Sequence, residues 1–196
     1  MDFGKEIIPA AIEGGFKVAS YEYNGYWEDI GTIRSFFEAN IALTDTLPAF
    51  NLYDNRRPIY TRARMLPPSK FFGTVFRKVL VAEGCIIHAE RIERSVIGIR
   101  SRIGEYTVIA NTFVMGNDYF QRLEEITDEG QIPIGIGKHC IIENCIVDKN
   151  CRIGDNVVIR GSKDLPNQET DTYAIVDGIV VLKKSAVIPS GSRIGA

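Results

Sequence analysis

The chain has 196 residues, of which 45% are hydrophobic and 24% are charged, and its formal net charge at pH 7 is −2. That length allows one large domain, or a large domain with a small companion, and a sizeable core. The nearly balanced charge argues against a basic surface for nucleic acid or an anionic membrane. No apolar run approaches the roughly 18 residues of a membrane helix and nothing resembles a signal peptide, so we expect a soluble cytoplasmic protein.

The first 45 residues predict a helix, a strand and a second helix. Apolar residues from Ile7 to Ile12 have helical spacing, Pro9 shortens or kinks this helix, and the glycines at 14–15 end it. Residues 17–23 alternate as a strand does. Thr32 is the expected N-cap of a second helix that ends near Thr44. One strand cannot form a sheet. The segment therefore packs on the rest of the chain or on another chain, or it is the tail end of a larger α/β domain.

Residues 46–78 are rich in proline, arginine and aromatic residues, as in Pro58-Ile59-Tyr60-Thr61. Proline fixes an extended backbone and cannot donate a ladder hydrogen bond. This segment is therefore expected to be a connector that lies along a surface.

From about residue 79 onward, apolar residues recur at intervals of six. A six-residue period fits neither an α-helix nor a flat strand, and it is typical of a parallel β-helix built from hexapeptide repeats. Chance could space apolar residues in this way, but glycines follow the same period, which favours the repeat. The residues expected to point inward are Ile97, Ile103, Ile109, Ile141, Val147, Ile153, Val176, Leu182 and Ile188, and Met115, Ile159 and Ile194 extend the same series.

Two segments interrupt the repeat. Residues 117–133 contain the acidic pairs Glu124-Glu125 and Asp128-Glu129 and a possible helical turn, and residues 161–173 are polar and contain a proline. Both are expected to be loops that leave the coil at a corner, where an insertion costs the stack little.

The four cysteines, at positions 85, 140, 145 and 151, lack Cys-x-x-Cys spacing. Metal or disulfide roles are possible readings of such a set. The expectation is that they are small buried or half-buried residues of the coil in a reducing compartment.

An ordered set of motifs resembles the ADP-glucose pyrophosphorylase (glucose-1-phosphate adenylyltransferase) family. The motifs are Asp2-Phe3-Gly4, Tyr26-Trp27-Glu28-Asp29-Ile30-Gly31-Thr32, Pro58-Ile59-Tyr60-Thr61, Leu66-Pro67-Pro68-Ser69-Lys70, Val114-Met115-Gly116, Ile132-Pro133-Ile134-Gly135-Ile136-Gly137 and Val147-Asp148-Lys149-Asn150. The resemblance runs over nearly the whole chain. The glycine-rich nucleotide loop and the first metal-binding aspartate of the family have no counterpart here.

The resemblance implies a mainly β fold, in which a left-handed parallel β-helix follows the α/β tail end of a nucleotidyltransferase catalytic domain. The expected divisions are a catalytic-domain remnant at residues 1–45, a connector at 46–78 and the β-helix at 79–196, so the chain is expected to be a carboxy-terminal portion. The implied reaction makes ADP-glucose and pyrophosphate from ATP and glucose 1-phosphate, for glycogen or starch synthesis, with Mg²⁺. A homotetramer under allosteric control is also implied.

The resemblance assigns roles to six residues. Asp29 matches a catalytic, metal-binding aspartate, whereas Asp2, Phe3 and Trp27 match positions that line the glucose 1-phosphate pocket. Lys149 and Lys184 match lysines that bind a phosphorylated effector, although the neighbouring Lys183 leaves the register of the second lysine open. We expect these two lysines to border one anion site.

Each role has a simpler alternative. Asp2 could cap the first helix, Trp27 could belong to a core, and Glu28-Asp29 could form a solvated turn before a helix. The whole chain could also be a noncatalytic module for subunit assembly and effector binding. A hexapeptide-repeat acyltransferase, with His88 or His139 as the general base, is a further alternative class.

Overall fold

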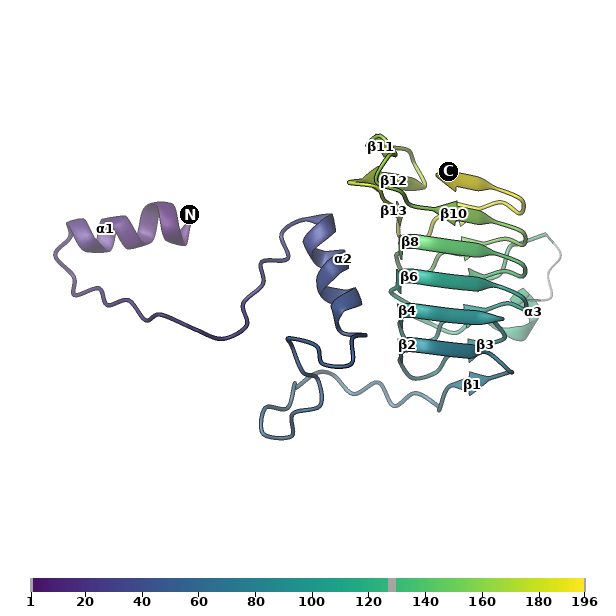
Figure 1. Ribbon diagram of the computed structural model, residues 1–196, viewed down its shortest axis with the longest axis horizontal. Coiled ribbons are helices and arrows are strands. Elements are labelled where there is room, and N and C mark those ends of the chain that lie inside the picture. The colour runs from purple at the N-terminus through teal and green to yellow at the C-terminus, as the bar shows by residue number, and fades with distance from the viewer. Residues whose placement is uncertain (1, 127–129, 196) are drawn as a thin grey trace.

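The computed structural model describes residues 2–126 and 130–195, and its main body is a stack of parallel coils (Figure 1). Strands β2, β4, β6 and β8 lie one above another in chain order along this stack. The parallel β-helix predicted from the spacing of six is therefore confirmed. Within the described residues, no helix is long and apolar enough to cross a membrane.

The elements have the following bounds. The π-helix η1 is Phe3–Ile7, and the α-helices are α1 Ile8–Glu13, α2 Ile33–Ala42 and α3 Leu123–Ile126. The strands are β1 Lys70–Phe71, β2 Val75–Val81, β3 Ile86–Ile87, β4 Arg91–Ile97, β5 Arg102–Ile103, β6 Val108–Val114, β7 Gly135–Ile136, β8 Ile141–Val147, β9 Arg152–Ile153, β10 Val158–Arg160, β11 Gln168–Glu169, β12 Tyr173–Val176, β13 Ile179–Leu182, β14 Val187–Ile188 and β15 Arg193–Gly195.

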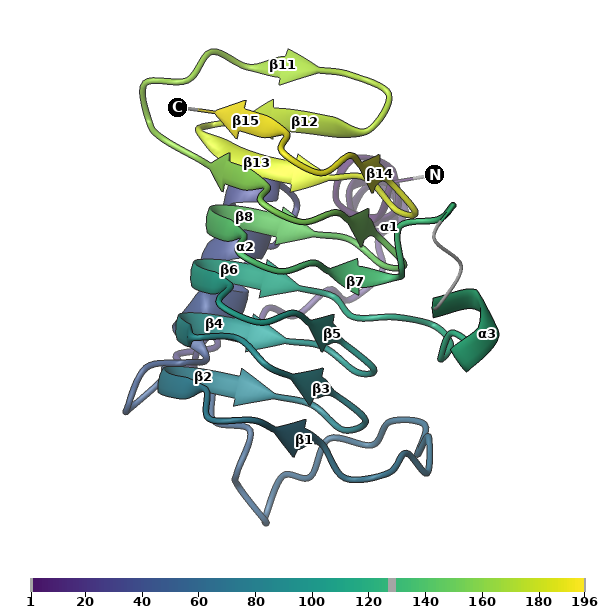
Figure 2. The same ribbon diagram turned by 90° about the vertical axis from the view of Figure 1, so that its right-hand side faces the viewer.

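Two sheets run along the stack (Figure 2). One contains the short strands in the order β1-β3-β5-β7-β9-β14, and the other contains the long strands in the order β11-β12-β13-β8-β6-β4-β2, with β10 beside β8 and β15. All pairs are parallel except β11 with β12 and β12 with β13. Pairing begins at Lys70, within the segment expected from the sequence to be a connector.

The uninterrupted coils are 16 or 17 residues long, and Val75 of β2 pairs with Arg91 of β4, 16 residues further on. Arg91 of β4 pairs with Val108 of β6, and Ile141 of β8 pairs with Val158 of β10. Between β6 and β8 the offset is larger, since Val108 pairs with Ile141, because the loop at 117–133 is inserted there. The strand pairing resumes in the same register beyond the loop, as expected for an insertion at a corner.

Each long strand turns a corner near its middle. Arg94, Asn111 and Asn144 occupy the left-handed region at this corner, with φ of 41°, 44° and 51°. Asparagine tolerates this conformation better than most residues. The amide of Asn111 also donates to Oδ1 of Asn144 at 2.6 Å, and that of Asn144 donates to the Gly161 carbonyl at 2.8 Å. The asparagines therefore connect successive coils as well as bending them.

The buried core confirms seven of the nine residues expected to point inward, all except Ile141 and Val176. Both exceptions are only partly buried, and the neighbouring Ile142 and Ile175 are buried instead. Ile142 is buried in place of Ile141 because the inward positions are not evenly spaced. The fully buried isoleucines at 92, 97, 103 and 109 are separated by five residues within the bent strand and by six residues elsewhere in the coil.

The same uneven step places Val114 rather than Met115 in the core. Val176 fails for another reason, since it lies in the antiparallel hairpin of β12 and β13 and not in a regular coil. A strict period of six therefore predicted the correct fold, but it placed the inward position one residue away at the bent strands β6 and β8.

Glycines in phase with the series permit close stacking. At Gly98, an added Cβ would collide with the carbonyl group of Met115 in the next coil, and at Gly116, where φ is +82°, it would collide with the Ile99 carbonyl. The neighbouring coil therefore requires glycine here, in agreement with the predicted absence of a Cβ.

All four cysteines are free and buried, as expected from their spacing and number. Burial raises the pKa of each thiol, to about 12 for Cys151 and further for Cys145. The thiolate form that reacts or binds metal is therefore scarce at neutral pH.

Helix α2 lies across the outer face of the long sheet (Figure 1). Thr32 caps it as predicted, with its Oγ1 accepting from the Ser35 amide at 3.1 Å. Phe37 and Ile41 are buried against Ile146 and Ile179 of the coil. Burying each of these side chains contributes roughly 1.5–3 kcal/mol, so the helix is firmly attached to the stack.

The chain before α2 extends away from the coil (Figure 1). Helix α1 has Pro9 in its first turn and is capped by Gly14, as predicted. The strand predicted at residues 17–23 is wrong, because this segment is extended but pairs with no strand of the described chain. Between residues 2 and 32, every side chain except that of Ala11 is exposed.

Both interruptions leave the coil at corners. The first contains α3, which confirms the helical turn, and the second contains β11. Asp128 and Glu129 of the acidic run lie outside the described residues.

The corrected register can be tested at the adjacent isoleucines of β8. Ile142→Ala should lower the free energy of unfolding by about 2–5 kcal/mol, because it leaves a cavity at a fully buried position. Ile141→Ala, the matched control, should cost about 1 kcal/mol because its side chain is only partly buried. Urea unfolding followed by circular dichroism measures both, and a larger loss for Ile141→Ala would contradict the register.

Candidate functional site

Three turns that follow neighbouring parallel strands meet at one corner of the coil. Asp118 follows β6, Lys149 follows β8 and Lys184 follows β13, and these strands are adjacent in the sheet. The backbone amide of Ser185 donates to the Lys149 carbonyl at 2.8 Å, which holds two of the turns against each other. Residues far apart in the sequence thus come together because their turns occupy the same place in successive coils.

Both lysines bind the same carboxylate. Nζ of Lys149 lies 2.7 Å from Oδ1 of Asp118, and Nζ of Lys184 lies 3.5 Å from Oδ2. Lys149 is the more buried of the two, with 31% of its side chain exposed against 59% for Lys184. We call Asp118, Lys149, Asn150 and Lys184 the Asp118 cluster.

Asn150 holds the carboxylate in place from a second direction. Its Nδ2 donates to Oδ2 of Asp118 at 3.0 Å, and its Oδ1 accepts from the Asp118 backbone amide at 2.8 Å. Asn150 has φ of 61°, a left-handed conformation that asparagine adopts readily. The turn that presents Lys149 therefore also fixes the acid that the lysine binds.

The cluster holds its acid strongly in the ionised form. The hydrogen bond from Lys149, then that from Asn150, together with the nearby lysine charges, lowers the pKa of Asp118 to about 2. Two ammonium groups facing one carboxylate leave a formal charge of +1. The cluster is thus a cationic position that already contains one anionic group.

The register of the second lysine is resolved by its partners. Lys183 pairs with Glu169 at 2.9 Å and Lys184 pairs with Asp118, so only Lys184 faces Lys149 across the shared acid. The structure therefore brings together the two lysines expected to border one site. Their role in binding an effector stays a prediction.

The residues expected in the sugar pocket lie apart from this cluster, on the exposed segment before α2. Asp2 caps η1, since its Oδ1 accepts from the Lys5 amide at 2.7 Å, as the simpler reading expected. Phe3 is exposed, and Trp27 is 82% exposed, so Trp27 belongs to no core within the described residues. No hydrogen bond within the described residues joins Asp2 to Asp29.

Asp29 lies in a solvated turn directly before the cap of α2. Its Oδ1 accepts from the Gly31 amide at 3.1 Å, and the residue is exposed. A carboxylate in this position offers the oxygen ligand that Mg²⁺ takes, so it fits one place in a metal site. In the part of the chain that the structure describes, no three His, Cys, Asp or Glu side chains gather as a ligand set.

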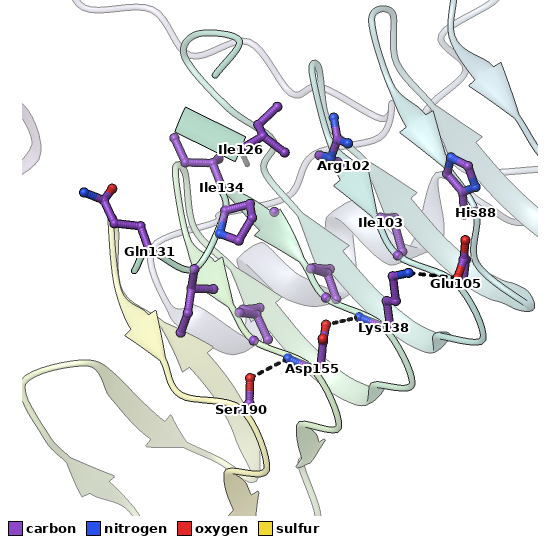
Figure 3. Close-up of a pocket in the computed structure, with 18 of the residues that line it drawn as sticks. His88, Arg102, Ile103, Glu105, Ile126, Gln131, Ile134, Lys138, Asp155 and Ser190 are labelled. Carbon is purple, nitrogen blue, oxygen red and sulfur yellow. Dashed lines mark hydrogen bonds and ion pairs between the residues drawn. The ribbon is translucent and has the colours of Figure 1, made fainter. Parts of the chain in front are cut away.

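A cavity of about 590 Å³ lies on the short-strand side of the coil (Figure 3). Successive coils place His88, Glu105, Lys138, Asp155 and Ser190 along one edge of it. Lys138 binds Glu105 through Nζ at 3.0 Å, and its amide donates to Asp155 at 2.7 Å. The Asp155 amide in turn donates to Oγ of Ser190 at 3.0 Å. These contacts join one coil to the next, which explains the row as a structural feature.

Both histidines stack on aromatic rings. The His88 and Phe72 ring centroids are 3.9 Å apart, and those of His139 and Tyr106 are 4.9 Å apart. His88 lies along the edge of the cavity just described, but neither ring makes a hydrogen bond to a described carboxylate or hydroxyl of the kind that orients a general base.

Asp118 is the residue of the cluster that the sequence analysis missed. It comes two residues after the Val114-Met115-Gly116 motif and is the second residue of the loop at 117–133. The strand register shows the connection: Val114 pairs with Val147, so the residues just after these two strands lie in adjacent turns.

Comparison with known proteins reveals relatives for both parts of the chain. The family described as "GLGC left-handed parallel beta-helix domain" matches residues 64–192. The chain belongs to this family. The coil in Figures 1 and 2 is accordingly left-handed, as the motif resemblance implied. The family described as "Nucleotidyl transferase" matches residues 1–46.

A wheat (Triticum aestivum) protein is similar along almost the whole chain. It is named glucose-1-phosphate adenylyltransferase small subunit, chloroplastic/amyloplastic, and it is 45% identical over 98% of this chain. The matched region is 42% of the wheat protein, so the chain spans less than half the length of this relative. The resemblance to ADP-glucose pyrophosphorylase predicted from the motifs is therefore confirmed.

The ionisation of Asp118 gives a direct test of the cluster. Its carboxyl carbon should titrate near pH 2 by NMR, and Lys149→Ala should shift that midpoint towards 3.8 because the largest cause of the low pKa is lost. The folded-state pKa lies below the unfolded value, so the Asp118 contacts stabilise the fold above about pH 4, and this stabilisation is lost as the pH falls towards 2.

Lys183→Ala is the matched control for this titration, because Lys183 pairs with Glu169 instead. It should leave the Asp118 midpoint unchanged. A midpoint near 3.8 in the unaltered chain would show that the Asp118 cluster does not form.

Proposed function

We propose that this chain forms part of a glucose-1-phosphate adenylyltransferase, which makes ADP-glucose and pyrophosphate from ATP and glucose 1-phosphate for glycogen or starch synthesis. The observation that carries the proposal is the 45% identity to the wheat small subunit over 98% of the chain. The matches of a nucleotidyl transferase family before a GLGC β-helix family support it.

The proposed chemistry is an in-line attack of the sugar phosphate on the α-phosphorus of ATP. Such a step depends on positioning and on neutralising phosphate charge, and it needs no protein nucleophile. The buried, protonated cysteines agree with that requirement. The reactive geometry must then come from side chains that bind and orient the two substrates.

The exposed segment before α2 supports the idea of a larger catalytic domain. Phe3, Phe16, Tyr21 and Trp27 are all largely exposed in this chain, whereas clustered apolar side chains usually cover a partner surface. We propose that residues 1–45 complete such a domain, with 46–78 as connector and 79–196 as β-helix. Packing against the remaining strands of that domain would also give residues 17–23 the pairing they lack here.

Within that domain, Asp29 is the proposed metal ligand and catalytic residue. The Gly31 amide, which donates to Oδ1, holds the carboxylate in its turn. Mg²⁺ bound there would neutralise phosphate charge. Asp2 would accept hydrogen bonds from sugar hydroxyl groups, and Phe3 and Trp27 would pack beside the sugar.

Regulation is assigned to the Asp118 cluster. Lys149 and Lys184 would bind a phosphorylated metabolite, since a few point charges converging on one position suit a phosphate group. We also propose a homotetramer, by resemblance to the family, and a cytoplasmic location. The name of the wheat relative places that protein in plastids.

A second candidate function is a noncatalytic module for assembly and effector binding. The observation in its favour is that the two lysines converge within the β-helix alone, without the segment before α2. The hexapeptide acyltransferase reading has no comparable support, because both histidines are stacked on aromatic rings.

Catalysis is tested by measuring pyrophosphate release with ATP, glucose 1-phosphate and Mg²⁺. The purified 196-residue chain should stay at the blank, because one carboxylate cannot position both substrates. In a full-length enzyme that contains this sequence, Asp29→Asn should lower kcat by about 100-fold or more, whereas its exposed neighbour, as Glu28→Gln, should change it little. Clear turnover by the chain alone, or an active Asp29→Asn enzyme, would contradict these roles.

Regulation is tested in the same full-length enzyme with Lys149→Ala and Lys184→Ala. The activator concentration for half-maximal effect should rise by about tenfold or more, because each variant removes one charge from the anion site. The rate without activator should change little. Lys183→Ala serves as the control, since Lys183 faces Glu169. Unchanged activation curves in both site variants would refute the assignment.

A further inference from the structure

Lys149 and Lys184 both contact an anionic group of the chain itself, the carboxylate of Asp118. Each oxygen of Asp118 takes one lysine: Oδ1 lies 2.7 Å from Lys149 Nζ and Oδ2 lies 3.5 Å from Lys184 Nζ. Asn150 donates to Oδ2 as well. The carboxylate thus accepts hydrogen bonds from Lys149 and Asn150 and forms an ion pair with Lys184 on a second turn, as a bound phosphate group could.

We propose that Asp118 is an internal competitor for the site of Lys149 and Lys184, which a phosphate monoester must displace in order to bind. This inference rests on the proposed effector role of the two lysines. It adds a residue that neither the motifs nor the family matches assign, and it names the ligand chemistry as a dianionic phosphate group.

The charges favour such an exchange only for certain ligands. Asp118 stays ionised at neutral pH, since its pKa is about 2, so the competitor is always present. A ligand with one negative charge only replaces the single charge of Asp118, so its binding gains little electrostatic free energy. A phosphate dianion brings a second charge and a third terminal oxygen, and both lysines can use them. The competitor therefore sets a minimum charge for ligands of this site.

The local structure lets the carboxylate move without unfolding the coil. Asp118 is exposed and is the second residue of the loop at 117–133. Its neighbour Asn117 is buried, and Nδ2 of Asn117 donates to the Arg100 carbonyl at 2.8 Å. The Asp118 backbone is held by Asn150 Oδ1 at 2.8 Å. A rotation of the Asp118 side chain would free both ammonium groups and leave these backbone contacts intact.

The test is a titration of the 196-residue chain with inorganic phosphate, followed by the amide NMR signals of Lys149 and Lys184. Asp118→Asn keeps the shape and the amide contacts but removes the competing charge. It should lower the half-saturating phosphate concentration about five- to tenfold. An unchanged or higher half-saturating concentration would overturn the proposal.

Glu105→Gln is the matched control. It removes one carboxylate from a similar exposed lysine pair, Glu105 with Lys138 at 3.0 Å, elsewhere on the coil. It should not change the titration, and a shift equal to that of Asp118→Asn would reduce the effect to net charge and overturn the proposal.

The lysine variants separate this inference from the proposed function. If Lys149→Ala and Lys184→Ala weaken phosphate binding but Asp118→Asn has no effect, the effector site stands and the competitor is refuted. If phosphate binds equally well to both lysine variants, the effector site itself is refuted, and the competitor with it. Tighter binding by Asp118→Asn that is lost on adding Lys149→Ala is the result that supports both.

Discussion

The in-register stacking of parallel coils is the constraint on which the rest of this structure depends. Each coil offers one row of apolar side chains to the interior, and no coil can bury that row without its neighbours. The isoleucines at 92, 97, 103 and 109 are all fully buried or nearly so, which shows how closely the interior is filled. Because the uninterrupted coils have nearly the same length, 16 or 17 residues, turns that follow equivalent strands lie one above another.

That stacking creates the Asp118 cluster and the row of side chains beside the cavity by the same means. In the Asp118 cluster, two lysines from two turns contact the carboxylate of Asp118, which belongs to a third turn. In the row beside the cavity, the charges of Glu105, Lys138 and Asp155 alternate along a corner of the coil. The difference is in the ratio of charges. The row sets two anions, Glu105 and Asp155, against one cation, whereas the cluster sets two cations against one anion. Of the two, the cluster therefore retains positive charge for an additional anion.

The fold was largely predictable from the sequence because the repeat leaves a direct periodic trace. The period of six was wrong at Ile141 because the inward positions within a bent strand are five residues apart, and a constant period does not include this change of spacing. Lys149 and Lys184 could be found through their motifs. Asp118 could not, since its importance depends on an offset of one coil plus an inserted loop, which becomes visible only when Val114 is paired with Val147. The strand expected at 17–23 did not form because no strand of the described chain lies beside it to pair with.

Helix α2 also limits how far the two parts of the chain can separate. Phe37 and Ile41 fix it to the coil, and Thr32 closes its first turn. Asp29 stands three positions before that cap, and an extended residue spans at most about 3.6 Å. The Cα of Asp29, whose carboxylate is proposed to bind metal, is therefore tethered within about 11 Å of the Cα of Thr32 at the start of α2. If the proposed catalytic domain surrounds Asp29, this short tether limits how far that domain can move relative to the coil.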